Sequence, residues 1–430
     1  MNVLRTREER NYYLEQKLSS FVGIDWATES HRVVFLNHEG RVIEEYDAVH
    51  SASGLEALVK RLDHNCRCPR AEVGIAIEVS WGALVEILVE RGFSVFAINP
   101  KQVDRFRDRY TVAGAKDDSR DALVLASALR TDRKSFKPVQ VDDPTIIRLR
   151  ELSRVEEELK TELRRAANQL WQQLHRYYPQ VLTLSPGADD LFVWDLLRRA
   201  PTPAKAAKLT EARIRQILAK HRITRFSVEE VLAILRSPSL QLAPGAAEAA
   251  SEHMLLLLPR ITLLDQQFRD VERRIKSLLK ELSASIPDSG KRHDVDLILS
   301  LPGVGPLIAA TMISEASSPI RERNYEALRC FAGTAPITKQ SAKRKTVNMR
   351  QACSARIRQA VYYWSTRSLV FDPRSRQHYQ TLRAKGHGHA RALRGVADRL
   401  LALLIALLKG GELFNLNRRL QLSPCPNPSL

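Results

Sequence analysis

The spacing of apolar residues changes along the chain from strand-like to helical. Short apolar runs predict five strands, at 21–24, 32–36, 41–46, 73–78 and 93–98. The second and third are joined by the turn sequence Asn37-His-Glu-Gly40, and helical patterns at 54–62 and 82–91 alternate with the later strands. Strands followed by alternating helices and strands predict a mixed sheet covered by helices, the order expected of a ribonuclease-H-like fold.

The middle third has a helical period instead. From about 145 to 285 leucines recur at helical spacing, with shorter helical patterns at 211–220 and 228–235. The clearest heptad run consists of Ile261, Leu264, Phe268, Val271, Ile275, Leu278 and Leu282. Two long apolar stripes predict an antiparallel coiled coil, which is either an oligomerising arm or an internal helical bundle. The pattern does not choose between them.

The last third is also mainly helical and begins with a glycine turn. The sequence Leu301-Pro-Gly-Val-Gly305 lies between a predicted helix at 295–300 and another that starts at Pro306. This is the shape of a helix-hairpin-helix, in which Gly303 and Gly305 would present backbone N–H groups to a nucleic-acid phosphate. A plain tight turn between two helices would require the same two glycines.

Composition favours a nucleic-acid partner. The chain has 430 residues, enough for about three domains, and its net charge of +18 with a pI near 9.9 favours a polyanion. Its five cysteines fit neither a disulfide framework nor a zinc site. The longest apolar stretch, 400–408, is well below the ~20 residues that span a bilayer. We therefore expect a cytoplasmic, DNA-associated protein.

The basic charge is concentrated in one segment. Between Lys339 and Arg376 there are ten Lys or Arg residues against one acid, with aromatic residues at 362–364 interleaved. Binding of a phosphate backbone is the natural use of such a segment, although a solvated basic face is the common alternative. The candidate phosphate contacts are Lys339, Lys343, Arg344, Lys345, Arg350 and Arg356.

Four acids in the first third are the candidate catalytic groups. Asp25 interrupts one apolar strand and Glu78 ends another, and a buried strand acid requires a cation or a partner. Asp118 and Asp121 lie three apart in a predicted helix, so they share a face on which Mg²⁺ could bind. The two could instead be an acidic first turn that stabilises the helix dipole. Spacing alone also allows Asp117 to replace Asp118.

Together these motifs resemble the DEDD-type insertion-sequence transposases, which are relatives of Piv-type DNA invertases and are known as bridge-RNA-guided recombinases. The resemblance covers about 21–408, with the motifs in the family's order. It implies a RuvC-like first domain, a coiled coil and a C-terminal transposase domain. The family pattern Lys-x-Asp-x-x-Asp-Ala assigns the acids to Asp25, Glu78, Asp118 and Asp121, as ligands of Mg²⁺, and places Asp117 at the variable position.

The resemblance also implies a serine nucleophile. The family's Gly-x-x-Pro…Ser-Gly stretch falls on Ser341, reached through Gly333 and Pro336, but Ala342 replaces the usual glycine. Other hydroxyl groups lie near it in the sequence, at Thr338, Thr346 and Ser354.

The expected organisation and function follow from this resemblance. We expect an extension at 1–20, a RuvC-like domain at 21–140, a helical coiled-coil region at 141–290, a transposase domain at 291–415 and a tail at 416–430. The implied function is DNA strand exchange through a phosphoserine intermediate by a dimer or tetramer, with a bridge RNA choosing both DNA sites. The alternatives are a metal-dependent ribonuclease-H-like nuclease or junction resolvase, and a non-catalytic nucleic-acid binding protein.

Overall fold

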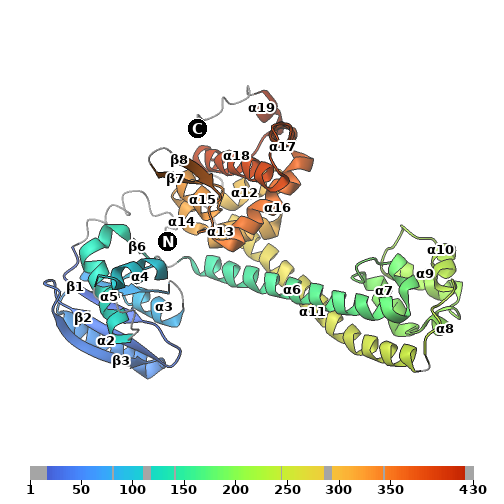
Figure 1. Ribbon diagram of the computed structural model, residues 1–430, viewed down its shortest axis with the longest axis horizontal. Helices are drawn as coiled ribbons and strands as arrows, with labels where there is room; N and C mark the ends of the chain where they lie inside the picture. The colour runs from blue at the N-terminus through green and yellow to red at the C-terminus, as the bar shows by residue number, and fades with distance from the viewer. Residues whose placement is uncertain are drawn as a thin grey trace. The chain divides into compact units, whose positions relative to one another are not determined.

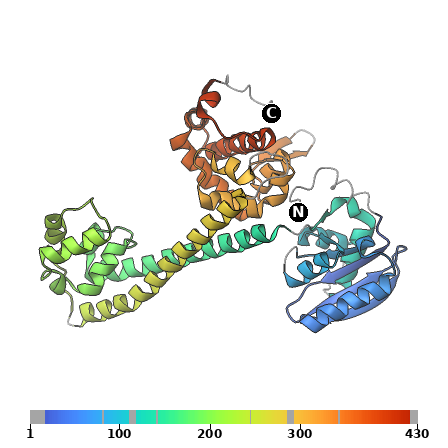
Figure 2. The same cartoon turned by 180° about the vertical axis from the view of Figure 1, so that it is seen from behind.

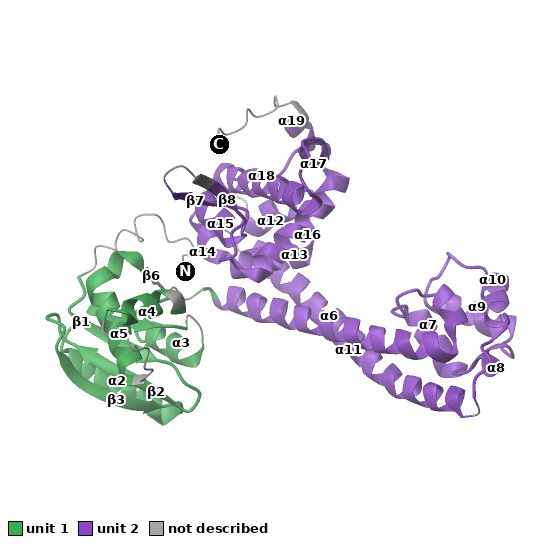
Figure 3. Ribbon diagram, in the orientation of Figure 1, with its two compact units in different colours: residues 1–143 green, residues 144–430 purple. Residues whose placement is uncertain are grey.

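The computed structural model describes residues 17–79, 82–109, 118–139, 142–243, 245–284, 293–341 and 344–421. The chain divides into two compact units, residues 1–143 and residues 144–430 (Figure 3). Within the described ranges, no helix combines the length and the apolarity needed to cross a membrane.

Unit 1 is a mixed sheet with helices on both faces (Figure 1). The sheet has five full strands and the two-residue β6, in the order β3-β2-β1-β4-β5-β6. Strands β1, β2 and β3 form an antiparallel meander, whereas β4 and β5 run parallel to β1. The elements are β1 (Ser20–Asp25), β2 (Ser30–Leu36), β3 (Val42–Val49), α2 (Ala52–Cys66), η1 (Arg70–Glu72), β4 (Val73–Ile77), α3 (Ala83–Glu90), β5 (Ser94–Ala97), α4 (Pro100–Arg107), α5 (Asp118–Asp132), η2 (Arg133–Ser135) and β6 (Lys137–Pro138).

Alternation along the central strand β1 produces two separate cores. Val22 and Ile24 pack with α2 and α3 on one face, and Phe21 packs with α4 and α5 on the other. Gly23 faces α5, and a Cβ atom there would lie only 1.8 Å from the Ala122 carbonyl oxygen. Since any side chain at this position would collide with the helix backbone, Gly23 allows α5 to lie directly on β1.

Unit 2 is almost entirely helical and contains one short hairpin (Figure 1). Its elements are α6 (Pro144–Tyr177), η3 (Pro179–Thr183), α7 (Leu191–Arg199), α8 (Pro203–Ala206), α9 (Glu211–Lys220), α10 (Val228–Leu235), α11 (Ala246–Ala284), α12 (Asp294–Leu299), α13 (Pro306–Glu315), α14 (Ser317–Arg321), α15 (Tyr325–Phe331), β7 (Ile337–Ser341), β8 (Arg344–Asn348), α16 (Ala355–Phe371), α17 (Pro373–Ala384), α18 (His389–Gly410) and α19 (Leu416–Gln421).

The long helices α6 and α11 lie side by side and connect two cores (Figures 1 and 2). The start of α6 and the end of α11 share a core with α12, α13, α16 and α18, while the other ends of both helices share a core with α7, α9 and α10. The pair is therefore antiparallel. In α11 the predicted apolar stripe faces inward, because Ile261, Leu264 and Ile275 are buried.

The mixed α/β architecture of the first unit and the helical character of the remainder are confirmed. Pro100 begins α4, a helix that follows the predicted strand at 93–98 and that the sequence patterns did not predict. A proline fits the first turn of a helix, where its missing N–H group would have no intrahelical partner. This unpredicted helix carries a residue of the candidate site.

Candidate active site and nucleic-acid interface

The first two candidate acids lie at the same edge of the sheet. Ile24 of β1 is paired with Ile77 of β4 in parallel register. Asp25 directly follows Ile24, and Glu78 directly follows Ile77. Both are half-buried. Alternation along the strands places both on the α5 side, because Phe21 and Ala76 pack into that core. Two carboxylates thus end adjacent parallel strands on one face.

The N-terminal turn of α5 reaches this edge. Arg32, which is opposite Asp25 in the β1–β2 register, donates a hydrogen bond from Nε to Ser119 Oγ at 2.7 Å. The other guanidinium nitrogens of Arg32 bind Glu45 and Asp47 of β3. Arg32 therefore ties the start of α5 to the strands beside Asp25. Asp118 is the first residue of α5, and its side chain lies outside the described residues.

Asp121 is buried and already has a cationic partner. It is 7% exposed, and its Oδ1 accepts a hydrogen bond from Arg107 Nε at 2.7 Å. Burial opposes the charge of Arg107, but hydrogen bonds to Asp121 and Asp104 raise its pKa overall. Arg107 is the last residue of α4, and sequence analysis missed its role because the helix itself was not predicted.

Carboxylate oxygens are suitable ligands for Mg²⁺, yet the described side chains are not assembled into a finished metal site. No group of three or more His, Cys, Asp or Glu residues is placed to hold an ion in the described part of the chain. Asp25 and Glu78 lie at one edge of the sheet, and Arg107 forms an ion pair with Asp121.

A buried histidine fixes the turn that follows Asp25. His31 is fully buried, and its Nδ1 accepts a hydrogen bond from the Ala27 backbone N–H at 3.3 Å. Since Nδ1 is an acceptor, Nε2 must donate to His50 Nδ1, which is 2.9 Å away. Burial, with a smaller effect of His50, lowers the pKa of His31. Neutral His31 thus holds the turn in place.

The candidate nucleophile lies on an exposed hairpin. Ser341 is the last residue of β7, is exposed, and pairs in antiparallel register with Arg344 of β8. Lys339 is also exposed and shares a strand face with Ser341, whereas Thr338 lies on the other face. Ser354 is the N-cap of α16 and accepts a hydrogen bond from the Ile357 N–H. Of the nearby hydroxyl groups, Ser354 thus has a structural role.

Part of the basic segment cannot be placed. Ala342 and Lys343 lie outside the described residues, and Arg344 and Lys345 are described only as backbone. Arg350 donates to the Ala335 carbonyl at 3.3 Å. These phosphate contacts stay predictions.

Arg356 braces helices within unit 2. It is paired with Glu157, and its Nε lies 3.0 Å from Glu315 Oε1. These carboxylates already balance the guanidinium charge, so a phosphate would have to compete with them.

The glycine turn between α12 and α13 fits closely against α16. Gly303 has φ +82°, and a Cβ atom there would lie 2.9 Å from the Ser368 backbone nitrogen. Trp364 of α16 donates from Nε1 to the Pro302 carbonyl at 3.0 Å. A Cβ atom at Gly305, the N-cap of α13, would meet nothing. The close approach of α16 explains Gly303, and binding of phosphate at this turn stays a prediction.

Comparison with known proteins gives two family matches. Residues 22–179 match a family model described as "Transposase", and residues 295–380 match one described as "Transposase IS116/IS110/IS902 family". The two matches cover the sheet of unit 1 with all of α6, and the region from α12 into α17.

Three individual relatives agree with these matches. The protein y4uE of Sinorhizobium fredii is 47% identical over 219 residues, which are 51% of this chain and 61% of y4uE. The mini-circle protein for IS117 of Streptomyces coelicolor is 31% identical over 414 residues, 94% of this chain and 97% of that protein. Both are provisionally named as transposases. The 43.6 kDa protein of insertion element IS110, also from Streptomyces coelicolor, is 24% identical over 92% of this chain and 95% of its own length.

Proposed function

The chain belongs to the IS116/IS110/IS902 family of transposases, and we propose that it cuts and rejoins DNA strands with Ser341 as nucleophile and four carboxylates as the catalytic acids. The observation that carries this proposal is the common edge of Asp25 and Glu78. The parallel register of β1 and β4 places the two side by side, and Gly23 lets α5 approach the same edge.

The strand order supports a RuvC-like interpretation of unit 1. A central strand flanked by an antiparallel meander on one side and parallel strands on the other gathers side chains at one end of the sheet. In that arrangement Asp25, Glu78, Asp118 and Asp121 would be the four acids of the DEDD set. Their oxygens would hold Mg²⁺, which when bound neutralises charge on the phosphate and lowers the pKa of a hydroxyl group.

The protein's own groups have separate tasks in this chemistry. Arg107 holds the Asp121 carboxylate in the ion pair, which keeps the buried charge compensated before substrate binds. Ser341, exposed at the end of β7, can reach a phosphate in solution without rearrangement of a core. Lys339 on the same strand face would attract the phosphate electrostatically.

The proposed covalent step conserves the phosphodiester bond energy. Ser341 Oγ loses its proton and forms a bond to phosphorus, while the bond from phosphorus to one sugar oxygen breaks and that oxygen takes a proton. The product is a phosphoserine link between protein and DNA. A sugar hydroxyl of a second strand end can then attack the same phosphorus and release Ser341, so that rejoining needs no external energy source.

The high positive charge suits more than one nucleic acid. We propose that a bridge RNA pairs with donor and target DNA, and that dimers or tetramers hold the two duplexes. The net charge of +18 provides counter-charge for RNA and DNA together. The carboxylates and Ser341 would then contribute to the same strand-transfer reaction.

The decisive experiment detects the covalent intermediate. The full chain, incubated with guide RNA, DNA and Mg²⁺, should become linked to a DNA strand that survives denaturation, and mass spectrometry should locate the bond at Ser341. Ser341→Ala should lose the link, whereas the matched Thr338→Ala should keep it. Unchanged cleavage by Ser341→Ala, with no adduct in either protein, would replace this proposal with a nuclease that uses water.

A further inference from the structure

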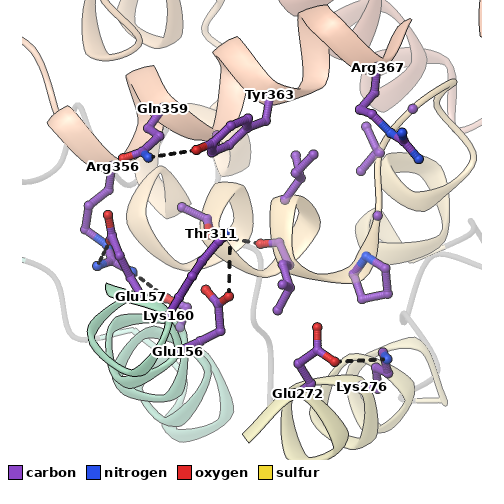
Figure 4. A pocket seen from close by; sticks show the side chains of 18 of the residues that line it. Glu156, Glu157, Lys160, Glu272, Lys276, Thr311, Arg356, Gln359, Tyr363 and Arg367 are labelled. Atoms are coloured by element: carbon purple, nitrogen blue, oxygen red, sulfur yellow. Dashed lines mark hydrogen bonds and ion pairs between the residues drawn. The ribbon is translucent and has the colours of Figure 1, made fainter. Parts of the chain in front are cut away.

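A cavity in unit 2 has no role in the chemistry described so far. It has a volume of about 750 Å³ and opens between α6, α11, α13 and α16, beside the turn that contains Gly303 (Figure 4). Part of its wall is apolar and is formed by Val304, Pro306 and Leu307. Charged side chains from α6, α11 and α16 line the rest. Its size lies within the ~300–1,000 Å³ typical of sites for small ligands.

The most unusual group in the wall is Glu156 of α6. It is only 8% exposed, and its Oε1 is buried and receives no hydrogen bond in the described part of the protein. The nearest cation, Lys160 Nζ, is 4.0 Å from this oxygen, which is beyond hydrogen-bonding distance. Burial raises the pKa of Glu156, an effect that Lys160 opposes and the neighbouring Glu272 reinforces. A buried carboxylate oxygen without a hydrogen bond destabilises the folded protein, and a ligand that donates a hydrogen bond to it would remove this cost.

An aromatic ring lies across the cavity from this carboxylate. Tyr363 of α16 is 40% exposed, and its hydroxyl group accepts a hydrogen bond from Gln359 Nε2 at 3.2 Å (Figure 4). Lys160 Nζ lies 5.5 Å from the ring centroid. A partly exposed ring that is anchored at its hydroxyl group is a suitable platform for a nucleobase.

Positive groups lie at another part of the wall. Arg164 and Arg367 line the cavity, and Arg367 lies over the ring of Phe371, with no ion pair to a carboxylate among the described side chains. The first turn of α13, from Pro306, lies in the same wall, and its N-cap Gly305 has no side chain to cap the free N–H groups. This end of the cavity therefore suits an anion.

From these features we propose that the cavity binds one unstacked guanine nucleotide of a DNA or RNA strand. The guanine base would stack on Tyr363 and donate hydrogen bonds from its N1–H and N2–H groups to Glu156. The phosphate of the nucleotide would lie near Arg367 and the start of α13. The proposal deepens the proposed function, since it rests on the binding of DNA and RNA proposed there. Guanine fits best because its N1–H and N2–H groups lie side by side and match a carboxylate. Adenine and cytosine would turn a ring nitrogen lone pair toward the carboxylate, and uracil and thymine would turn carbonyl oxygens toward it.

The test measures binding of GMP, AMP, CMP and UMP to the full chain by calorimetry, without Mg²⁺. GMP should bind about tenfold more tightly than the other three, as expected for hydrogen bonds to a charged group. Glu156→Gln should weaken GMP binding about tenfold and remove the preference. The matched control is Glu158→Gln, since Glu158 is exposed on the same helix and does not line the cavity. Tyr363→Ala should weaken all four nucleotides about tenfold through lost stacking.

The outcomes separate this proposal from the catalytic one. Equal affinity for the four nucleotides, or an unchanged preference for GMP in a folded Glu156→Gln protein, would overturn it. Because the assay involves no cleavage, it gives the same answer whether or not Ser341 is the nucleophile. Ribo- and deoxyribo-tetranucleotides containing one guanine identify the source: tighter binding of one assigns the site to that strand, and equal binding shows that only the base is recognised.

Discussion

Asp25 ends a strand that has neighbours on both sides and a helix on its face, whereas Ser341 ends a strand of a two-stranded hairpin that is exposed to solvent. The acid edge, which consists of Asp25, Glu78 and the first turn of α5, is fixed by strand register and by Gly23. In the Ser341 hairpin, β7–β8, the residues 338–341 of β7 are all exposed and Ile337 is half-buried.

The fold thus positions Asp25 and Glu78 side by side, whereas it leaves Ser341 on an exposed surface. A buried site loses function or stability when its support is removed. An exposed site should depend instead on its ligands and on ionic strength. The following predictions test whether the two regions differ in this way.

The largest effect is expected at the acid edge. Asp25→Asn keeps the shape of the side chain but removes its charge, so Mg²⁺-dependent strand cleavage should fall on the order of 10³-fold, with nucleic-acid affinity almost unchanged. Asp132→Asn, at the opposite end of α5, is the matched control and should cleave normally. Cleavage assays with Mg²⁺ and with EDTA measure this. Full activity of the Asp25→Asn protein, or of the wild type in EDTA, would contradict a role of the acids in metal binding.

Gly23 should be the structural weak point of the same edge. Gly23→Ala places a Cβ atom 1.8 Å from the Ala122 carbonyl oxygen, so α5 must move away from β1. We expect a loss of about 1–3 kcal/mol in the free energy of unfolding, as for other overpacked cores, measured by urea denaturation. Gly388→Ala is the control, because a Cβ atom there meets nothing. Equal stability of the two variants would show that α5 is not held against β1 by close contact.

The sequence predicts much of the acid edge because its signals are local. An acid at the end of an apolar strand is visible in a short window, and the sequence predicts both the strand that Asp25 ends and the strand that Glu78 follows. Arg32 and Arg107 were not expected as parts of the site, because each meets α5 from an element distant in sequence. Nothing in the spacing of charges reveals such a partner. If Asn99-Pro100 is interpreted as the start of a helix, the sequence predicts α4 and places Arg107 on it.

The hairpin is predictable in a different way. The serine was assigned through the family resemblance, and the periodicity of the sequence did not predict the two strands around it. Exposed strands lack the alternation of apolar and polar residues that marks a half-buried strand. Similarly, the cavity beside Gly303 depends on four helices from distant parts of the chain, so Glu156 had no signal in the sequence beyond its place on a helix.

Changes of charge in the Ser341 hairpin should alter nucleic-acid affinity, whereas changes of packing at the acid edge should alter stability. Replacing Lys343, Arg344 and Lys345 together by Gln should weaken nucleic-acid binding without regard to sequence, and should reduce the slope of log affinity against log salt by about one for each lost phosphate contact. Binding titrations between low and moderate salt measure the slope. The same three changes should leave the free energy of unfolding of unit 1 as it is. An unchanged salt slope would mean that these residues do not touch phosphate.

The smallest expected effect is a dependence of unit 1 on pH. Burial and His50 lower the pKa of His31, so the folded protein holds this side chain neutral while the unfolded chain protonates it near the ordinary value of 6.5. As the pH falls through that value, the unfolded state binds more protons, and the stability of unit 1 should decrease. His31→Asn should make unfolding of unit 1 less dependent on pH between 7 and 5, even if it lowers stability at pH 7.

Burial also lowers the pKa of His378 in unit 2, to about 4, so His378→Asn serves as a control that should change only the pH dependence of unit 2. Hydrogen exchange, followed separately for the two units, distinguishes these effects. If the His31→Asn protein kept the full pH dependence of unit 1, the turn after Asp25 would not be held by a neutral histidine, and the acid edge would be less firmly fixed than its strand register indicates.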